Sequence, residues 1–172
     1  MIKLLLLLFS LVFFNIPDIC ALQILVSGGK PVTANNYYST YEPSYLTDGT
    51  VNTCWLNPSY SGWATVDLQQ PVKISQVTFY DLVSSGSSTL SLYIDNNFIE
   101  TKTLSLSGGV ITPFIFDVPD ITGQYVKMNI TNSASWVEGH EFEIYSTTVP
   151  EPATCIMFFL GIFLNFIRKK GE

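Results

Sequence analysis

The amino-acid sequence predicts an all-β protein, an antiparallel jelly-roll sandwich, in the central part of a 172-residue chain. Apolar and polar residues alternate there with the two-residue period of half-buried strands. Residues that favour turns separate the alternating segments, and no convincing amphipathic helix occurs between them. Short strands with frequent turns are typical of sandwiches and barrels, so we expect roughly seven or eight short strands around one core.

Four segments carry the alternation. Residues 63–68 come first, and residues 90–94 follow. In residues 125–130 the apolar side chains at 126, 128 and 130 fall on one face and the polar ones on the other. The last segment, residues 141–145, puts Phe142 and Ile144 on the buried face. Each segment therefore predicts a strand with one face in the core.

Residues suited to turns lie between these segments. Asp95-Asn96-Asn97 and Gly108-Gly109 tolerate positive φ, so each predicts a turn. Pro113 cannot donate a hydrogen bond to a neighbouring strand, which places its strand at an edge or a bulge. The serine cluster at residues 84–88 is expected to form an exposed loop.

Residues 1–21 have the layout of a secretory signal peptide. Lys3 precedes an apolar run over residues 4–14, and the small residue Ala21 marks the expected cleavage site. The run is shorter than the roughly 20 apolar residues that span a bilayer. The alternative is an uncleaved N-terminal anchor.

Residues 149–172 consist of three parts in a fixed order. Pro150-Glu151-Pro152 is rigid and extended, an apolar run over residues 153–167 follows, and residues 168–170 are basic. Basic residues stay on the cytoplasmic side of a membrane, so the preceding chain is expected to face outward.

This C-terminal segment resembles a PEP-CTERM sorting signal. The resemblance implies transient anchoring in the inner membrane of a Gram-negative bacterium and removal of the tail by an exosortase-type protease. The alternative is an ordinary C-terminal membrane anchor, and on both interpretations the central part is exported. The expected organisation is a signal peptide at 1–21, a β-sandwich at 22–148 and a sorting signal at 149–172.

Charge and cysteine content limit what the central domain can do. It contains four lysines, no arginine and eleven acidic residues, hence a net charge of −7. An acidic surface without arginine disfavours nucleic acid and anionic lipid as partners. Cys54 is the lone cysteine of this domain, so an internal disulfide is excluded and we expect Cys54 to be packed beside Trp55.

Several motifs together indicate a family. They are DGTVNTCW from Asp48, WATVDL from Trp63, PVKISQVTFYD from Pro71, and YVKMNITNSASWVEGHEFEIY from Tyr125. The stretch from Thr33 to Tyr145 resembles the discoidin or coagulation factor 5/8 type C family, which includes family 32 carbohydrate-binding modules. The resemblance implies a galactose-binding-like jelly roll, with Trp55 and Trp63 in its core.

The first motif also raises the possibility of a calcium site. Asp48 supplies a carboxylate, Gly49 a tight turn and Thr53 a hydroxyl, and Ca²⁺ takes six to eight oxygen ligands. The resemblance implies a structural calcium held by Asp48, Thr53 and Glu141, with backbone carbonyls near Tyr45 and His140. Thr50 stands where the family often has Asn or Asp. The alternative is that Asp48-Gly49 only forms a turn.

Exposed aromatic residues are the candidates for ligand binding. Sugar sites stack pyranose rings on aromatic faces, and the aromatics expected in loops are Tyr37, Tyr38 and Trp136, with Tyr41 and Tyr60 beside them. Arginine is absent from the domain and His140 is its one histidine. The specificities known for the family are therefore not transferred to this chain.

The expected function is an exported, non-catalytic carbohydrate-binding or adhesion module at the cell surface or in the extracellular matrix. Its partner would be an extracellular polysaccharide. One alternative is a structural matrix protein without a specific ligand. Another is a glycosidase that uses Glu141 and Glu143, which lie about 7 Å apart on one strand face. No nucleophilic Ser/His/Asp arrangement is legible in the sequence.

Overall fold

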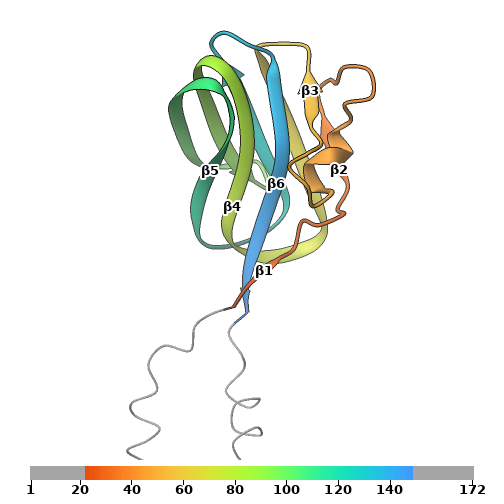
Figure 1. Ribbon diagram of the computed structural model, residues 1–172. Helices are drawn as coiled ribbons and strands as arrows, with labels where there is room; N and C mark the ends of the chain where they lie inside the picture. The colour runs from red at the N-terminus through yellow and green to blue at the C-terminus, as the bar shows by residue number, and fades with distance from the viewer. Residues whose placement is uncertain (1–21, 149–172) are drawn as a thin grey trace, which may run out of the picture. The chain divides into compact units, whose positions relative to one another are not determined.

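The computed structural model describes residues 22–148, so the expected signal peptide and sorting signal lie outside the described residues. Within that range no helix is long and apolar enough to cross a membrane. The elements, labelled in Figure 1, confirm the all-β class. In chain order they are β1 (Leu22–Leu25), β2 (Val32–Ala34), the 3₁₀ helix η1 (Pro43–Thr47), β3 (Trp55–Asn57), β4 (Ser61–Ile94), β5 (Asn97–Asn132) and β6 (Val137–Thr148).

The strands differ from the short ones that were expected. β4 and β5 each run on through several bends and pair with each other along most of their length. Gln69 has φ +67° and Gly86 has φ +101°, and register shifts occur beside both. Figure 1 shows both strands curling round so that their inner faces oppose each other. The chain therefore turns between the layers within β4, at residues that depart locally from extended conformation.

Backbone pairing brings β6 into the middle of the fold. The strand order is β1-β6-β4-β2, with β3 also paired to β6 and β5 to β4. The hairpin between β4 and β5 turns at Asp95 and Asn96, whose φ values of 47° and 67° confirm the predicted turn. Pro113 pairs with Tyr80 of β4 on one side only, which confirms the expected edge position.

The core forms as the alternation predicts. Its side chains come from β4, β5 and β6, and Phe79 and Phe142 pack edge to face with ring centroids 5.3 Å apart. Trp55 is fully buried and its indole N–H donates to the Asn36 carbonyl at 2.9 Å. Fully buried members from the alternating segments are Ala64, Val66, Leu68, Leu90, Leu92, Ile94, Val126, Met128, Ile130, Phe142 and Ile144.

Two expectations about burial were wrong. Trp63 is not in the core, because the strand places Ala64 and Val66 inward and Trp63 outward, where the Lys127 ammonium lies 4.8 Å from its ring centroid. The serine cluster is not simply an exposed loop, because it continues β4 and Ser88 is fully buried.

Gly139 lets β6 approach the rest of the sandwich closely. A Cβ at this position would lie 2.5 Å from Cζ of Phe79 and 2.9 Å from Cδ2 of Leu46. Leu46 belongs to η1, so the absence of a side chain at Gly139 allows η1 and the following loop to pack against β6. This packing places the loop from Asp48 beside Glu141.

Candidate functional site

Three loops that carry exposed aromatic residues are tied together by backbone hydrogen bonds. They comprise residues 35–42, 58–60 and 132–136. The Tyr38 amide donates to the Leu56 carbonyl of β3 at 2.8 Å, and the Val137 amide donates to the Ser59 carbonyl at 3.0 Å. These bonds, with the pairing of β3 to β6, place the three loops at one end of the sandwich.

Two of the predicted ligand-binding residues lie side by side there. The rings of Tyr38 and Trp136 have centroids 5.6 Å apart and planes inclined at 53°. Tyr38 is 50% exposed and Trp136 is 43% exposed, so both rings can reach a ligand. Tyr37 is also exposed, but among the described residues its ring contacts neither of them. We refer to Tyr38 and Trp136 as the aromatic pair.

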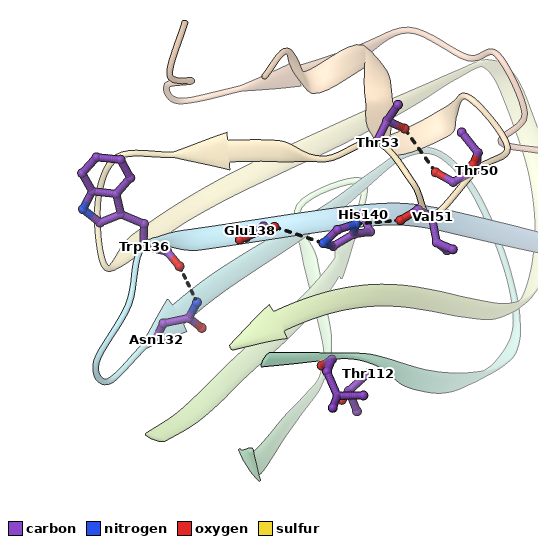
Figure 2. A network of polar contacts seen from close by, with 9 residues as sticks. Thr50, Val51, Thr53, Thr112, Asn132, Trp136, Glu138 and His140 are labelled. Carbon is purple, nitrogen blue, oxygen red and sulfur yellow. Dashed lines mark hydrogen bonds and ion pairs between the residues drawn. The ribbon is translucent and has the colours of Figure 1, made fainter. Parts of the chain in front are cut away.

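Two residues close to Trp136 in the chain carry buried polar atoms without a partner. The Asn132 side-chain amide donates to the Trp136 carbonyl at 3.1 Å (Figure 2), while its Oδ1 and the Ser135 hydroxyl are buried and unpartnered in the described part of the chain. A buried polar group without a partner costs about 1–3 kcal/mol. Sequence reasoning missed both residues, because Asn and Ser in a loop give no signal of burial.

The predicted calcium residues also come together. The Thr53 hydroxyl donates to Oδ2 of Asp48 at 2.6 Å, and the Thr50 amide donates to Oδ1 of Asp48 at 3.0 Å. The Gly49 amide donates to Oε1 of Glu141 at 3.3 Å. The loop is thus closed by its own hydrogen bonds and presents two carboxylates and a hydroxyl in one place.

Glu141 is the least satisfied member of this group. It is 3% exposed, and its Oε2 is without a hydrogen-bond partner among the residues in view. Burial, and then the charges of Asp48 and Glu143, raise the pKa of the Glu141 carboxyl to about 7. A hard cation would relieve both the burial of charge and the repulsion. Residues 22–148 hold no cluster of three or more His, Cys, Asp or Glu side chains with metal-binding spacing.

His140 fastens the same loop to β6. Its Nδ1 lies 2.9 Å from the Val51 carbonyl, and its Nε2 lies 3.2 Å from a carboxylate oxygen of Glu138 (Figure 2). Since a carbonyl only accepts, Nδ1 must be the donor there. Sequence reasoning did not foresee this link, because Val51 and His140 are 89 residues apart.

The thiol of Cys54 adjoins the same glutamate. Burial is the larger cause, and the charge of Glu138 the smaller one, that together raise the pKa of the Cys54 thiol to about 11. Cys54 is only partly buried, so the expected packing beside Trp55 is incomplete. At this pKa the thiol is a poor nucleophile and a poor metal ligand near neutral pH.

Asp81 is the most deeply buried charged residue among those whose side chains the structure describes. It is fully buried on the inner face of β4, and neither carboxylate oxygen makes a hydrogen bond of good geometry with any described residue. Burial raises the pKa of this carboxyl from 3.8 to about 6; the nearby Ser88 hydroxyl opposes the shift, and Glu138 adds to it. His140 also lies close enough to favour the charged form.

Comparisons with known proteins agree with this architecture. The family model described as F5/8 type C domain matches residues 31–143. No curated protein sequence matches the chain.

Solved structures share the fold at low identity. A Streptococcus pneumoniae fucose binding module is 20% identical, with a TM-score of 0.56, and covers 72% of this chain and 95% of that chain. CpGH89CBM32-4 from Clostridium perfringens, in complex with GlcNAc-α-1,4-galactose, is 16% identical, with a TM-score of 0.58 and coverages of 77% and 100%. The family 89 glycoside hydrolase of the same organism is 18% identical, with a TM-score of 0.59, but only 16% of that chain is matched, against 74% of this one.

Replacing Asp81 by Asn should stabilise the domain above pH 6. The folded state holds the proton more tightly than the unfolded state, so the contribution of Asp81 to the free energy of unfolding is greatest below pH 3.8 and is lost as the pH rises through about 6. We expect Asp81→Asn to raise the free energy of unfolding at pH 8 by roughly 1–3 kcal/mol, measured by urea denaturation.

The matched control is Asp117→Asn, which removes an exposed carboxylate that accepts from Gln76. It should change the free energy of unfolding by less than about 0.5 kcal/mol at any pH. A loss of stability in Asp81→Asn at pH 8 would contradict this prediction, because it would show that a neighbouring group in the domain is stabilised by the charged form of Asp81.

Proposed function

Because the chain belongs to the F5/8 type C domain family, we propose that it is a non-catalytic carbohydrate-binding module that contacts its ligand through the aromatic pair. The observation that carries this proposal is the meeting of two half-exposed rings, Tyr38 and Trp136, from loops nearly 100 residues apart in sequence. Solved relatives in fold include a fucose binding module and a protein complexed with GlcNAc-α-1,4-galactose, which supports the same ligand class.

The mechanism is stacking supplemented by hydrogen bonds. The apolar face of a pyranose ring packs on an aromatic ring, and hydroxyl groups of the sugar bond to polar atoms of the loops. Each such contact is weak, so we propose that affinity for extracellular polysaccharide arises from many copies displayed together.

Binding, rather than hydrolysis, is the activity that this geometry supports. Glu141 accepts a hydrogen bond from the Gly49 amide and is 3% exposed, so its carboxyl group is not accessible to a substrate. Glu143 accepts from the Tyr145 hydroxyl at 2.9 Å. The two carboxylates are therefore held by protein groups, and the glycosidase alternative gains no support from them.

Removing either ring of the aromatic pair should weaken binding to glycans. We expect Tyr38→Ala and Trp136→Ala each to weaken binding by roughly fivefold or more on a glycan array, because a stacked aromatic contributes about 1 kcal/mol or more. Tyr37→Ala should have a smaller effect, since its ring lies outside the pair.

Phe98→Ala provides the matched control for these variants. Phe98 is more exposed than either ring of the pair and packs against Tyr93, outside the three loops. It should leave binding unchanged. A folded wild-type protein that binds no glycan at high concentration would instead favour a structural matrix protein without a specific ligand.

We also propose that the loop following η1 holds a structural Ca²⁺. Asp48, Thr53 and Glu141 would provide side-chain oxygens, and the Thr50 carbonyl lies 3.2 Å from the Thr53 hydroxyl (Figure 2). The carbonyl groups of Tyr45 and His140 stay predicted ligands. The ion would neutralise the two carboxylates and fasten the loop to β6, and it would take no part in chemistry.

Calcium should raise the melting temperature of the domain, and a chelator should lower it again. An ion that binds only the folded state stabilises it by about 2.7 kcal/mol at a concentration one hundred times its dissociation constant. Glu141→Gln should remove the calcium-dependent shift, whereas Glu100→Gln, at an exposed carboxylate beside Lys102, should preserve it. A melting temperature that is the same in calcium and in chelator would contradict the site.

We propose that the domain acts outside the cell. The support is the sequence of the two ends: a signal-peptide pattern at 1–21, and Pro150-Glu151-Pro152 followed by an apolar run and basic residues. Export across the inner membrane, transient anchoring there and removal of the tail by an exosortase-type protease would deliver the module to the surface or matrix of a Gram-negative bacterium.

Mass spectrometry of the mature protein tests this processing. We expect an N-terminus near residue 22 and a C-terminus that lacks residues 168–172. Pro150→Ala together with Pro152→Ala should leave the tail attached, because the extended stretch that a protease needs is lost. A mature protein that retains Arg168 would indicate an ordinary membrane anchor instead.

A further inference from the structure

The outer face of β5 carries three side chains that the proposed function does not use. Tyr125, Lys127 and Asn129 alternate with the fully buried Val126 and Met128, so all three point away from the core. Tyr125 is 49% exposed, and Lys127 and Asn129 are partly exposed, so a ligand can reach them from solvent. We refer to Tyr125, Lys127 and Asn129 as the β5 row.

Lys127 stands in the middle of the β5 row with its ammonium held in place. Residues 126–131 pair with 61–66 on one side and with 89–94 on the other, so a segment of β4 flanks Lys127 on each side. The ammonium lies 4.8 Å from the centroid of the Trp63 ring. A cation held over an aromatic face has already lost part of its side-chain freedom, so little further ordering is needed when it meets an anion.

The ammonium of Lys127 forms no ion pair with any residue that the structure describes. The residues opposite it on the two flanking segments are Thr65 and Tyr93, neither of which carries a carboxylate. Its neighbours on the same face of β5 are Tyr125 and Asn129. The positive charge therefore stands without an opposite charge directly beside it and can pair with an anion from outside.

Two acidic residues border the β5 row, and protein groups occupy both. Asp67 lies opposite Tyr125, and its Oδ1 accepts from the Gln124 side-chain amide and from the Gln69 backbone amide, each at 2.8 Å. Asp95, in the turn between β4 and β5, accepts from the Tyr125 backbone amide at 2.9 Å. Both acids lie at the Tyr125 end, so the charge in the middle of the row is that of Lys127.

The groups on either side of Lys127 suit a sugar. Tyr125 offers an exposed ring against which the apolar face of a pyranose can pack, and the Asn129 amide can both donate to and accept from hydroxyl groups. Successive members of the row are about 7 Å apart along the strand. One sugar unit with a carboxylate can therefore meet the ring of Tyr125 and the ammonium of Lys127 together.

We propose that the β5 row is a second carbohydrate-binding site and that it takes sugars carrying a carboxylate group. Tyr125 stacks on the sugar ring, Lys127 pairs with the carboxylate, and Asn129 binds a hydroxyl group. The net charge of −7 on the domain opposes this anion only weakly, because the screening length is about 8 Å at physiological ionic strength. The site lies on a sheet face rather than on the loops of the aromatic pair, and it extends the proposed function because both sites take glycans.

Polygalacturonate and its methyl ester test the proposal, because they share a backbone and differ in charge. In calorimetric titrations of the mature protein at about 50 mM salt, we expect the acid to bind roughly threefold to fivefold more tightly than the ester. This is the gain from one exposed ion pair of good geometry. The difference should largely disappear at about 500 mM salt, because the ion pair is then screened.

Substitutions in the β5 row separate charge from stacking. Lys127→Gln should remove the preference for the acid, whereas Lys127→Arg should keep it, because the cation is retained. The matched control is Lys73→Gln, which makes the same change in net charge at an exposed residue opposite Thr122 and should leave the preference intact. Tyr125→Ala should weaken binding of the acid and of the ester alike, since stacking does not depend on charge.

Two results would overturn this inference: wild-type protein that binds the ester as tightly as the acid, or Lys127→Gln protein that keeps the preference. The double variant Tyr38→Ala with Trp136→Ala should still prefer the acid, because the β5 row is intact. Loss of all acid binding in that double variant would also overturn the second site. Unchanged binding of neutral glycans by the double variant would instead contradict the proposed role of the aromatic pair and leave the β5 row standing.

Discussion

The close packing of β6 against Phe79 and Leu46, permitted by Gly139, is the contact on which the candidate sites depend. Glu138, His140 and Glu141 lie on β6, and Trp136 stands directly before it. The loop from Asp48 reaches β6 because η1 packs there, and the aromatic loops reach it through β3. A shift of this one strand would separate Tyr38 from Trp136 and Asp48 from Glu141 together.

The alternation of apolar and polar residues predicted the core, but it did not predict the side of the sheet on which every large side chain lies. Ala64, Val66 and Met128 are buried as the period of two requires. Trp63 breaks the expectation because a large aromatic can lie on the outer face of a sheet, here with the Lys127 ammonium over its ring, and size alone does not tell the two faces apart. The sequence also carried no signal that β4 continues through its bends, because Gln69 adopts a positive φ although it is not a glycine.

The candidate sites were predictable to different extents. A motif placed Asp48 and Thr53 in one loop, and the family resemblance added Glu141 from the last strand. The contact between Tyr38 and Trp136 followed only from the fold, because three loops had to be brought to one end. The links of His140 to Val51 and of Asn132 to Trp136 depend on local backbone geometry, for which the residue types give no signal.

The protonated state of Cys54 has a consequence for the durability of the protein. With a pKa of about 11, only about one thiol in ten thousand is ionised at pH 7. Thiol–disulfide exchange and oxidation both begin from the ionised form. In an aerated medium without reductant, two copies of the domain would therefore form an intermolecular disulfide through Cys54 only very slowly. The domain can thus carry one free thiol with little covalent dimerisation.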